Sequence, residues 1–245
     1  TLCDIGTASV KEICYFTGVT TAVVQNLVKR GIAEFYDIEI FRNPYESIEV
    51  PKDTQAITLS NEQQRAFHHL KQQYETGKGG VSLLYGVTGS GKTLVFMKLI
   101  DEVYQQGKGV IVMVPEISLT PQTIGRFHKR YGNRVAVFHS ALSMGERLDE
   151  WKRVKNGQAL IAVGTRSAVF APFEHLGLII MDEEQEYTYK SESSPRYHAR
   201  EVAKYRCAYH NALLVLASAT PSLESYFMAE NGRYSLESLP HRYGD

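Results

Sequence analysis

The sequence VSLLYGVTGSGKT occupies residues 81–93 and decides the fold. Residues 81–85 form a short apolar run typical of a buried strand, and residues 94–104 have the apolar spacing of a helix. Between them, residues 86–93 match the phosphate-loop pattern G-x-x-x-x-G-K-S/T in full. Because a strand precedes this turn and a helix follows it, a chance glycine-rich turn is the weaker interpretation.

The loop is expected to bind ATP together with Mg²⁺. Its glycines let the backbone curl so that N–H groups point at phosphate oxygens, and the helix N-terminus adds its positive end. Lys92 is expected to bridge the β- and γ-phosphates, and the Thr93 hydroxyl to ligate Mg²⁺. The loop residues expected to bind the nucleotide are Gly86, Thr88, Gly89, Ser90, Gly91, Lys92 and Thr93.

An acidic segment further along the chain is expected to supply the carboxylates that act together with this loop. Residues 178–184 read LIIMDEE, an apolar strand that ends in carboxylates. Asp182 is expected to hold Mg²⁺ through water, and Glu183 to orient the attacking water and accept its proton. Such a strand end is often only solvated, but its pairing with a complete phosphate loop predicts an ATP hydrolase with Lys92, Asp182 and Glu183 as catalytic residues.

From residue 57 onward, apolar strands alternate with amphipathic helices. This alternation predicts an α/β fold with a parallel sheet, covered by helices on both faces, and with ligands at the carboxyl ends of the strands. Strands are expected at residues 81–85, 109–114, 134–138, 159–163, 178–181 and 212–217, and helices at 94–104, 121–131, 143–156 and 197–209.

The first fifty residues are expected to form a small separate unit. Residues 8–16 and 21–29 have helical apolar spacing, and the run 32–42 is rich in β-forming residues. Two helices followed by a β wing are typical of a winged helix, so we expect a winged-helix domain at 1–52, a linker at 53–57 and the ATP-binding lobe at 58–245. The unit is either a DNA-binding or docking module or a protein–protein spacer.

Charge and composition exclude some classes of protein. The net charge is zero, and residues 1–52 carry 5 Lys and Arg against 7 Asp and Glu, so a DNA contact must be local and not a broad basic face. No apolar run approaches the roughly 18 residues of a membrane span. Three scattered cysteines fit a reducing cytoplasm, and the first residue is not Met, so we expect a cytoplasmic piece of a longer protein.

The ordered motifs from residue 59 to the C-terminus resemble superfamily 2 helicases, and within them the PriA family of replication-restart helicases. Residues 59–63, LSNEQ, resemble the Q-type motif, whose glutamine contacts adenine, which places Gln63 on the base. Further segments match in order and spacing: VPEISLTPQ at 114–122, HSAL at 139–142, GTRSA at 164–168 and SATP at 218–221. The resemblance implies a RecA-like P-loop NTPase lobe preceded by a small winged-helix domain.

Several of these segments place hydroxyls and amides where they could hold DNA. Loop residues that follow strands, close to helix N-termini, can bind backbone phosphates without reading the base sequence. Two further hydroxyls follow the strand at 212–217, beside the carboxylates, and could relay the state of the γ-phosphate to the DNA side. The residues are Thr120, Ser140, Thr165 and Arg166 for the phosphate contacts, and Ser218 and Thr220 for the relay.

A tyrosine-rich segment lies between the acidic strand end and SATP. It resembles the aromatic-rich loop of PriA and RecQ-type helicases, and aromatic faces stack on bases of any sequence. Tyr187, Tyr189 and Arg196 lie in a polar, serine-rich stretch and are expected to couple to DNA, although a plain surface loop is as good a reading. Tyr205 and Tyr209 are four residues apart on a helix and are expected to pack in the core.

The chain departs from the family pattern in two respects. Gln185 stands where these helicases usually have a histidine after the acidic residues, which puts the coupling assigned to that histidine in doubt. The second motor lobe, whose arginines complete the ATP site, and the zinc-binding cysteines of the family have no counterpart in these 245 residues. We therefore expect this chain alone to bind nucleotide weakly and to hydrolyse it slowly or not at all, and zinc only in the remainder of a full-length protein.

The leading hypothesis is an ATP-driven DNA helicase. By resemblance it moves 3′ to 5′ on single-stranded DNA, binds stalled or forked DNA, and works with primosome or single-strand-binding proteins, with no membrane partner. Two alternatives are another superfamily 2 DNA translocase and a winged-helix regulator with an ATPase switch. The acidic-leaning N-terminal unit argues against strong sequence readout by the regulator.

Overall fold

The computed structural model describes residues 10–35 and 56–243. The chain divides into two compact units, Thr1–Ile40 and Phe41–Asp245. Each unit is described by itself.

The N-terminal unit contains two short helices, α2 (Val10–Thr17) and α3 (Thr21–Lys29). Gly18, between them, has φ of 70°, a left-handed conformation that glycine adopts at low cost and that reverses the chain. The helix pair is as predicted. However, residues 32–35 form no strand, and the rest of the predicted wing and most of the linker at 53–57 lie outside the described residues. The winged helix therefore stays a prediction.

The larger unit is built on a seven-stranded sheet in the order β3-β4-β2-β5-β6-β1-β7, with every paired strand parallel. The strands are β1 (Gly80–Gly86), β2 (Gly109–Met113), β3 (Val135–Phe138), β4 (Ile161–Gly164), β5 (Leu176–Asp182), β6 (Leu213–Ser218) and β7 (Ser235–Leu239). The six predicted strands are confirmed, and the α/β class with them. β7 was not predicted, because its alternating sequence SLESL is short and half-exposed at the sheet edge.

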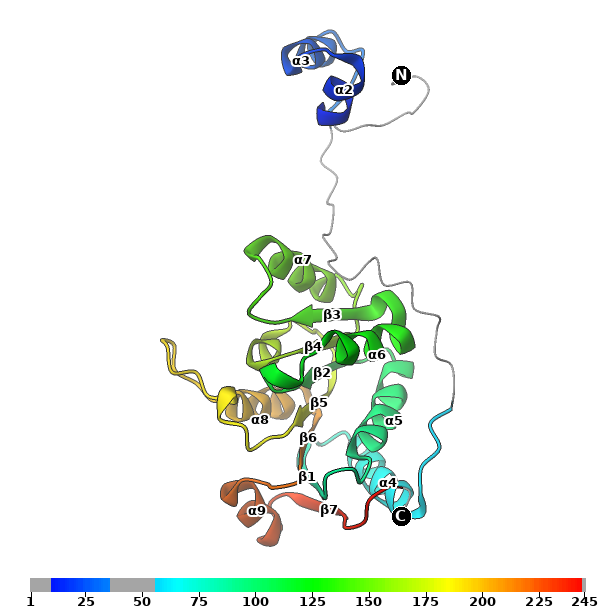
Figure 1. Ribbon diagram of the computed structural model, residues 1–245, viewed down its shortest axis with the longest axis vertical. Coiled ribbons are helices and arrows are strands. Elements are labelled where there is room, and N and C mark those ends of the chain that lie inside the picture. The colour runs from blue at the N-terminus through cyan, green and yellow to red at the C-terminus, as the bar shows by residue number, and fades with distance from the viewer. Residues whose placement is uncertain (1–9, 36–55, 244–245) are drawn as a thin grey trace. The chain divides into compact units, whose positions relative to one another are not determined.

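Helices cover both faces of this sheet (Figure 1). One face carries α4 (Asn61–Glu75), α5 (Lys92–Gln105) and α6 (Pro121–Tyr131), and the other carries α7 (Met144–Lys155), α8 (Ala199–His210) and α9 (Leu223–Glu230). Short 3₁₀ turns lie at η1 (Glu116–Ser118), η2 (Gly132–Arg134), η3 (Arg166–Phe170) and η4 (Tyr187–Tyr189). Each face has its own apolar core, so the strands are buried on both sides, as a parallel sheet requires.

Capping residues explain where several helices begin. The Ser60 and Gln63 side chains form a capping box at the start of α4, and Ser143 and Glu146 form another at α7. The Thr120 hydroxyl accepts a hydrogen bond from the Thr123 N–H, with a proline at the first position of α6. These local signals place the starts of α6 and α7 within one residue of the predicted ranges.

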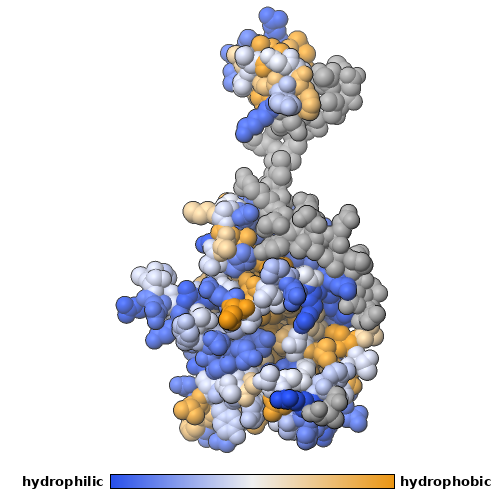
Figure 2. Space-filling view, viewed as in Figure 1, coloured by the Kyte–Doolittle hydropathy of each residue, from blue (hydrophilic) through white to orange (hydrophobic). Residues whose placement is uncertain are grey.

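The surface of the molecule is mixed. On the face drawn in Figure 2, hydrophilic side chains predominate and hydrophobic residues form separate small groups. Within the described ranges, no helix combines the length and the apolar character needed to cross a membrane.

A test of the sheet packing uses Gly164, which pairs with Phe138 across β4 and β3. A Cβ at Gly164 would lie 2.1 Å from the Phe138 carbonyl oxygen, so Gly164→Ala must push two paired strands apart. We expect the free energy of unfolding, measured by denaturant titration, to fall by about 1–3 kcal/mol.

The matched control is Gly125→Ala in α6, where a Cβ would meet nothing within 4 Å. We expect this control to raise the free energy of unfolding by about 0.5–1 kcal/mol, because alanine restricts the unfolded chain and suits a helix interior. Equal stability of the two variants would contradict the packing described for β3 and β4.

Candidate active site at the carboxyl edge of the sheet

Three adjacent strands end together at one edge of the sheet. β5, β6 and β1 are neighbours, and the register pairs Asp182 with Ala217 and Tyr85 with Ser218. The carboxyl ends of parallel strands at such an edge are where ligands bind in open α/β sheets. The phosphate loop, the acidic strand end and the SATP segment therefore meet, as the sequence predicted.

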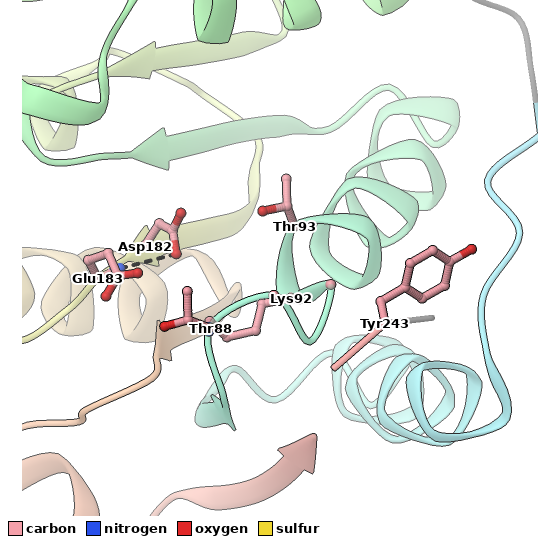
Figure 3. A pocket seen from close by; sticks show the side chains of 8 residues that line it. Thr88, Lys92, Thr93, Asp182, Glu183 and Tyr243 are labelled. Atoms are coloured by element: carbon pink, nitrogen blue, oxygen red, sulfur yellow. Dashed lines mark hydrogen bonds between the residues drawn. The ribbon is translucent and has the colours of Figure 1, made fainter. Parts of the chain in front are cut away.

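The phosphate loop connects β1 to α5 through two left-handed residues. Gly89 and Gly91 have φ of 83° and 81°, conformations that side chains with a Cβ adopt only with strain. The loop borders a cavity of about 320 Å³, and Figure 3 shows the side chains of Thr88, Lys92 and Thr93 among those that line it. The lining residues are Thr88, Gly89, Gly91, Lys92, Thr93, Asp182, Glu183 and Tyr243.

Two predicted loop residues stand apart from this lining. Gly86 ends β1, and a Cβ there would lie 2.7 Å from the Ser90 Oγ and 2.9 Å from the Leu239 Cβ. The Ser90 hydroxyl is buried and has no hydrogen-bond partner among the described residues. Gly86 and Ser90 therefore do not line this cavity and instead pack within the turn, whereas the other five predicted loop residues line the cavity.

Lys92 is bound to its own loop. Its Nζ donates hydrogen bonds to the carbonyl oxygens of Gly86 at 2.6 Å and Val87 at 3.4 Å. Burial lowers the pKa of this ammonium group, while Glu183 and Asp182 act in the opposite direction. The ammonium is therefore held by the loop at the edge of the cavity that Asp182 and Glu183 also line.

The acidic strand end places two carboxylates beside that ammonium. Asp182 is largely buried at the end of β5, and burial, with a further contribution from Glu183, raises its pKa to about 6. Its Oδ1 accepts a hydrogen bond of 3.1 Å from the Glu183 N–H. Glu183 has φ of 47°, and a residue other than glycine in this left-handed region is typical of functional sites.

The oxygen donors around the cavity fit a magnesium ion. The Thr93 hydroxyl and the Asp182 carboxylate both line it, and Mg²⁺ prefers one or two protein oxygens completed by water and phosphate. The described part of the chain contains no group of three or more His, Cys, Asp or Glu that could enclose a metal by itself. The donor set therefore suits a metal that binds together with a nucleotide.

Gln63 lies beside the phosphate loop, and its predicted contact with adenine stays a prediction. Its side chain is 1% exposed, and both of its polar atoms are engaged within the protein. Oε1 accepts a hydrogen bond from the Ser60 N–H at 2.9 Å, and Nε2 donates to the Ser90 carbonyl at 2.9 Å. A Cβ on Gly91 would lie 2.3 Å from Nε2. Gln63 thus braces the phosphate loop against α4.

Gln185 connects the catalytic carboxylate to the SATP segment. Its Nε2 donates to the Glu183 Oε2 at 2.9 Å, and its Oε1 accepts from the Ser218 hydroxyl at 2.6 Å. The Ser218 oxygen in turn accepts from the Thr220 N–H at 2.8 Å. An amide donates at one end and accepts at the other, so glutamine at this position supports a continuous path from Glu183 to Thr220.

Sequence analysis missed a buried cluster around Glu184, which is 1% exposed. Its carboxylate accepts from the Ser222 N–H at 2.6 Å, the Ser225 hydroxyl at 2.9 Å and Arg200 Nη1 at 3.1 Å. The cluster joins the end of β5 to α8 and α9. In the sequence, Glu184 is simply the third acidic residue of the run 182–184. Nothing in the sequence pattern distinguishes it from a solvent-exposed neighbour of Asp182 and Glu183.

The predicted phosphate-contact residues follow β2, β3 and β4, but they do not all present free donors. Thr120 and Ser140 are exposed, and the Thr120 hydroxyl caps α6. Thr165 is buried, with 5% of its surface exposed. Arg166 Nη1 donates to the Lys190 carbonyl at 2.5 Å, and its guanidinium lies 5.8 Å from the Tyr197 ring centre. Arg166 thus holds the tyrosine-rich segment.

The tyrosine predictions need two corrections. Tyr189 is fully buried in the core under α8, and its hydroxyl donates to the Asp182 carbonyl at 2.7 Å, so it is no surface residue for stacking. Tyr205 and Tyr209, which were expected to pack, are 73% and 74% exposed, because α8 buries Ala199, Ala203 and Cys207 instead. Tyr187 is 80% exposed and Arg196 is exposed, as the prediction of a polar loop requires.

Comparison with known proteins gives consistent matches. The family model for DEAD/DEAH box helicases matches residues 60–228. The chain is 47% identical over 231 residues to replication restart protein PriA of Bacillus subtilis, covering 94% of this chain and 29% of that protein. It is 46% identical over 181 residues to PriA of Treponema pallidum, covering 73% of this chain and 27% of that protein. The chain therefore spans under a third of the length of these relatives.

A solved structure matches at the level of the fold. It is RecG bound to a three-way DNA junction, with a TM-score of 0.57 and 23% identity over 80% of this chain and 27% of that one. This likeness confirms the RecA-like helicase fold predicted for the larger unit. The winged helix expected at residues 1–52 stays a prediction.

The brace between Gln63 and the phosphate loop can be tested with Gln63→Glu. Glutamate preserves the acceptor for the Ser60 N–H but replaces the donor to the Ser90 carbonyl with a second oxygen. We expect dissociation constants for ADP and for inorganic tripolyphosphate, measured by calorimetry, to rise alike by about ten-fold, near the loss of one buried hydrogen bond.

The matched control is Gln64→Glu, the same charge change on a residue whose amide contacts only His68 and no part of the loop. We expect it to bind both ligands as the wild type does. A loss of ADP affinity with unchanged tripolyphosphate affinity in Gln63→Glu would instead show that Gln63 contacts the base.

Proposed function

This chain belongs to the DEAD/DEAH box helicase family, and we propose that it supplies the ATP-binding lobe of a DNA helicase that acts in replication restart. The observation that carries the proposal is the convergence of Lys92, Asp182 and Glu183 on one cavity. Sequence identity of 46–47% to PriA proteins over most of the chain supports the restart role.

The side chains at the cavity have separable tasks in ATP hydrolysis. Mg²⁺, held by Thr93 and Asp182, supplies charge neutralisation on the phosphates when bound. Lys92 binds the transferred phosphoryl group electrostatically, and Glu183 orients water and receives its proton. Gln185 holds the Glu183 carboxylate by its 2.9 Å hydrogen bond, which restricts the side chain to one orientation.

The finer assignments rest on the resemblance to PriA. We propose movement 3′ to 5′ on single-stranded DNA, preference for forked or stalled-replication DNA, and cooperation with primosome or single-strand-binding proteins in the cytoplasm. Residues 1–52 are proposed to form a winged helix, and zinc is proposed only for parts of a full-length protein beyond this chain. Tyr187 and Arg196, both exposed on the segment held by Arg166, are the proposed DNA contacts.

The motor proposal predicts the behaviour of Lys92→Ala in the full-length protein. We expect forked DNA to stimulate ATP turnover in the wild type, and the variant to lose turnover by at least about 100-fold, because a preorganised charge on the phosphoryl group is removed. Phosphate release assays with and without forked DNA measure both the stimulation of the wild type and the loss of turnover in the variant. Turnover that ignores DNA while still requiring Lys92 would preserve the ATP site and overturn the helicase assignment.

The path through Gln185 predicts an uncoupled phenotype for Ser218→Ala, which removes the donor to the Gln185 Oε1. We expect the stimulation by DNA to fall about five-fold, the size of a coupling energy near 1 kcal/mol. ADP affinity and DNA-free turnover should stay at wild-type values and serve as internal controls. A uniform loss of all three properties would mean that Ser218 supports the site structurally and not as a relay.

A further inference from the structure

A row of basic side chains lies along the amino edge of the sheet, opposite the edge that carries the phosphate loop. Each strand is preceded closely by a Lys, an Arg or a His. The residues that carry a permanent charge are exposed and define the amino-edge row. In the order of the strands across the sheet they are Arg134 before β3, Lys155 before β4, Lys108 before β2, Lys78 before β1 and Arg233 before β7.

The first half of this row is continuous, because the turns that hold it contact one another. Arg134 Nη1 donates to the Gly157 carbonyl at 2.9 Å, which joins the turn before β3 to the turn that follows Lys155. Lys155 lines a cavity of about 330 Å³ together with His175, before β5, and Gly107, the neighbour of Lys108. The turns before β3, β4, β2 and β5 therefore form one surface.

The second half continues along the same edge. A Cβ on Gly79 would lie 3.3 Å from the Ala212 carbonyl oxygen, so the turn that holds Lys78 contacts the turn before β6. β7 pairs with β1, with Ser235 opposite Ser82, which places Arg233 at the amino edge as well. Neighbouring strands lie about 4.8 Å apart, so the row extends over roughly 29 Å.

The charges of the row are not neutralised by acidic side chains. Among residues 10–35 and 56–243, none of the five forms an ion pair with a carboxylate. Glu174 is the one acidic residue in the turns that lead into the seven strands of the described sheet. The nearest others in sequence end helices: Glu75, which pairs with Lys71 at 3.8 Å, and Glu230. Five cations thus face one carboxylate in these turns.

Helix dipoles do not account for the row. The C-terminus of a helix favours basic residues in its last turn, and the effect falls off beyond that turn. However, α4, α5 and α9 have no basic residue in their last turns. Lys78, Lys108 and Arg233 each stand three residues beyond the end of one of these helices, where the chain is exposed. Their placement suits contact with an external anion.

We propose that the amino-edge row binds the phosphate backbone of duplex DNA, an inference that rests on the proposed action on forked DNA. A length of roughly 29 Å matches about eight base pairs of a duplex that rises 3.4 Å per base pair. Such contacts hold the backbone without reading the bases. A fork contains duplex arms, and the row holds one of them at the edge of the sheet opposite the ATP site.

The aromatic side chains favour a duplex over a single strand. Sites for single strands combine charge with exposed aromatic faces on which bases stack. The aromatic residues in the turns of this edge are Phe173 and Tyr234, and both are buried, at 7% and 9% exposure. The edge therefore offers charge without a stacking surface, which fits a ligand whose bases are already paired.

The test measures binding of a fluorescent blunt duplex of about 20 base pairs to this 245-residue chain by anisotropy, over a series of salt concentrations and without nucleotide. For the triple variant Lys78→Ala, Lys108→Ala, Arg233→Ala we expect affinity at low salt to fall at least about ten-fold. The slope of log affinity against log salt should become shallower by about 2.7, because each phosphate contact contributes about 0.9.

The matched control removes the same charge from the bodies of α4, α5 and α6 with Arg65→Ala, Lys98→Ala and Arg126→Ala, and should change affinity by less than about two-fold. A charge-preserving triple variant, Lys78→Arg, Lys108→Arg, Arg233→Lys, should bind as the wild type does. Equal losses in the two alanine triples, or an unchanged affinity in the first, would overturn the proposal.

Two further outcomes would also overturn it. One is a wild-type chain that binds no duplex or that loses single-stranded DNA equally in the amino-edge triple. The other is polyglutamate that displaces the duplex at a lower charge concentration, which would assign the row to an acidic protein. Because nucleotide is absent, failure of the helicase function would appear separately, as ATP turnover by the full-length wild type that ignores forked DNA.

Discussion

Burial of a parallel sheet on both faces is the constraint on which the rest of the structure depends. Strands β5, β6 and β1 carry almost no polar side chains along their length, because helices cover both sides of them. Polar residues are therefore confined to the points where the strands end. The three ends coincide, so Asp182, Ser218 and the phosphate loop are brought together by the packing of apolar residues elsewhere.

Hydrogen bonds to main-chain atoms then tie the outlying segments to this edge. Tyr189 binds the carbonyl of Asp182, Arg166 binds the carbonyl of Lys190, and Glu184 holds the N–H of Ser222. The contacts of Tyr189 and Glu184 join neighbouring segments to the end of β5, and the contact of Arg166 joins the tyrosine-rich segment to η3. Tyr189 therefore connects the tyrosine-rich segment directly to the main chain at Asp182.

Much of this arrangement could be predicted from sequence, and the parts that could not have physical reasons. The phosphate loop between β1 and α5 and the carboxylates at the end of β5 lie where the sequence predicted them, because glycine spacing and strand-terminal carboxylates are local signals. Their roles in nucleotide binding and hydrolysis stay predictions. The burial of Tyr189 and the exposure of Tyr205 depend on which face α8 turns to the sheet, which spacing alone left undecided. The hydrogen bonds of Gln63 to Ser60 and to Ser90 in the phosphate loop were also beyond the sequence motif, because they depend on how α4 packs against the loop.

The hydrogen bonds of Lys92 have a consequence for the charge balance of the loop. An ammonium group in a buried site would normally face the cost of desolvation alone. Here the carbonyl oxygens of Gly86 and Val87 accept hydrogen bonds from Nζ within the same loop. The phosphate loop therefore compensates part of the desolvation cost of its own lysine, and it keeps a positive charge at the edge of the cavity.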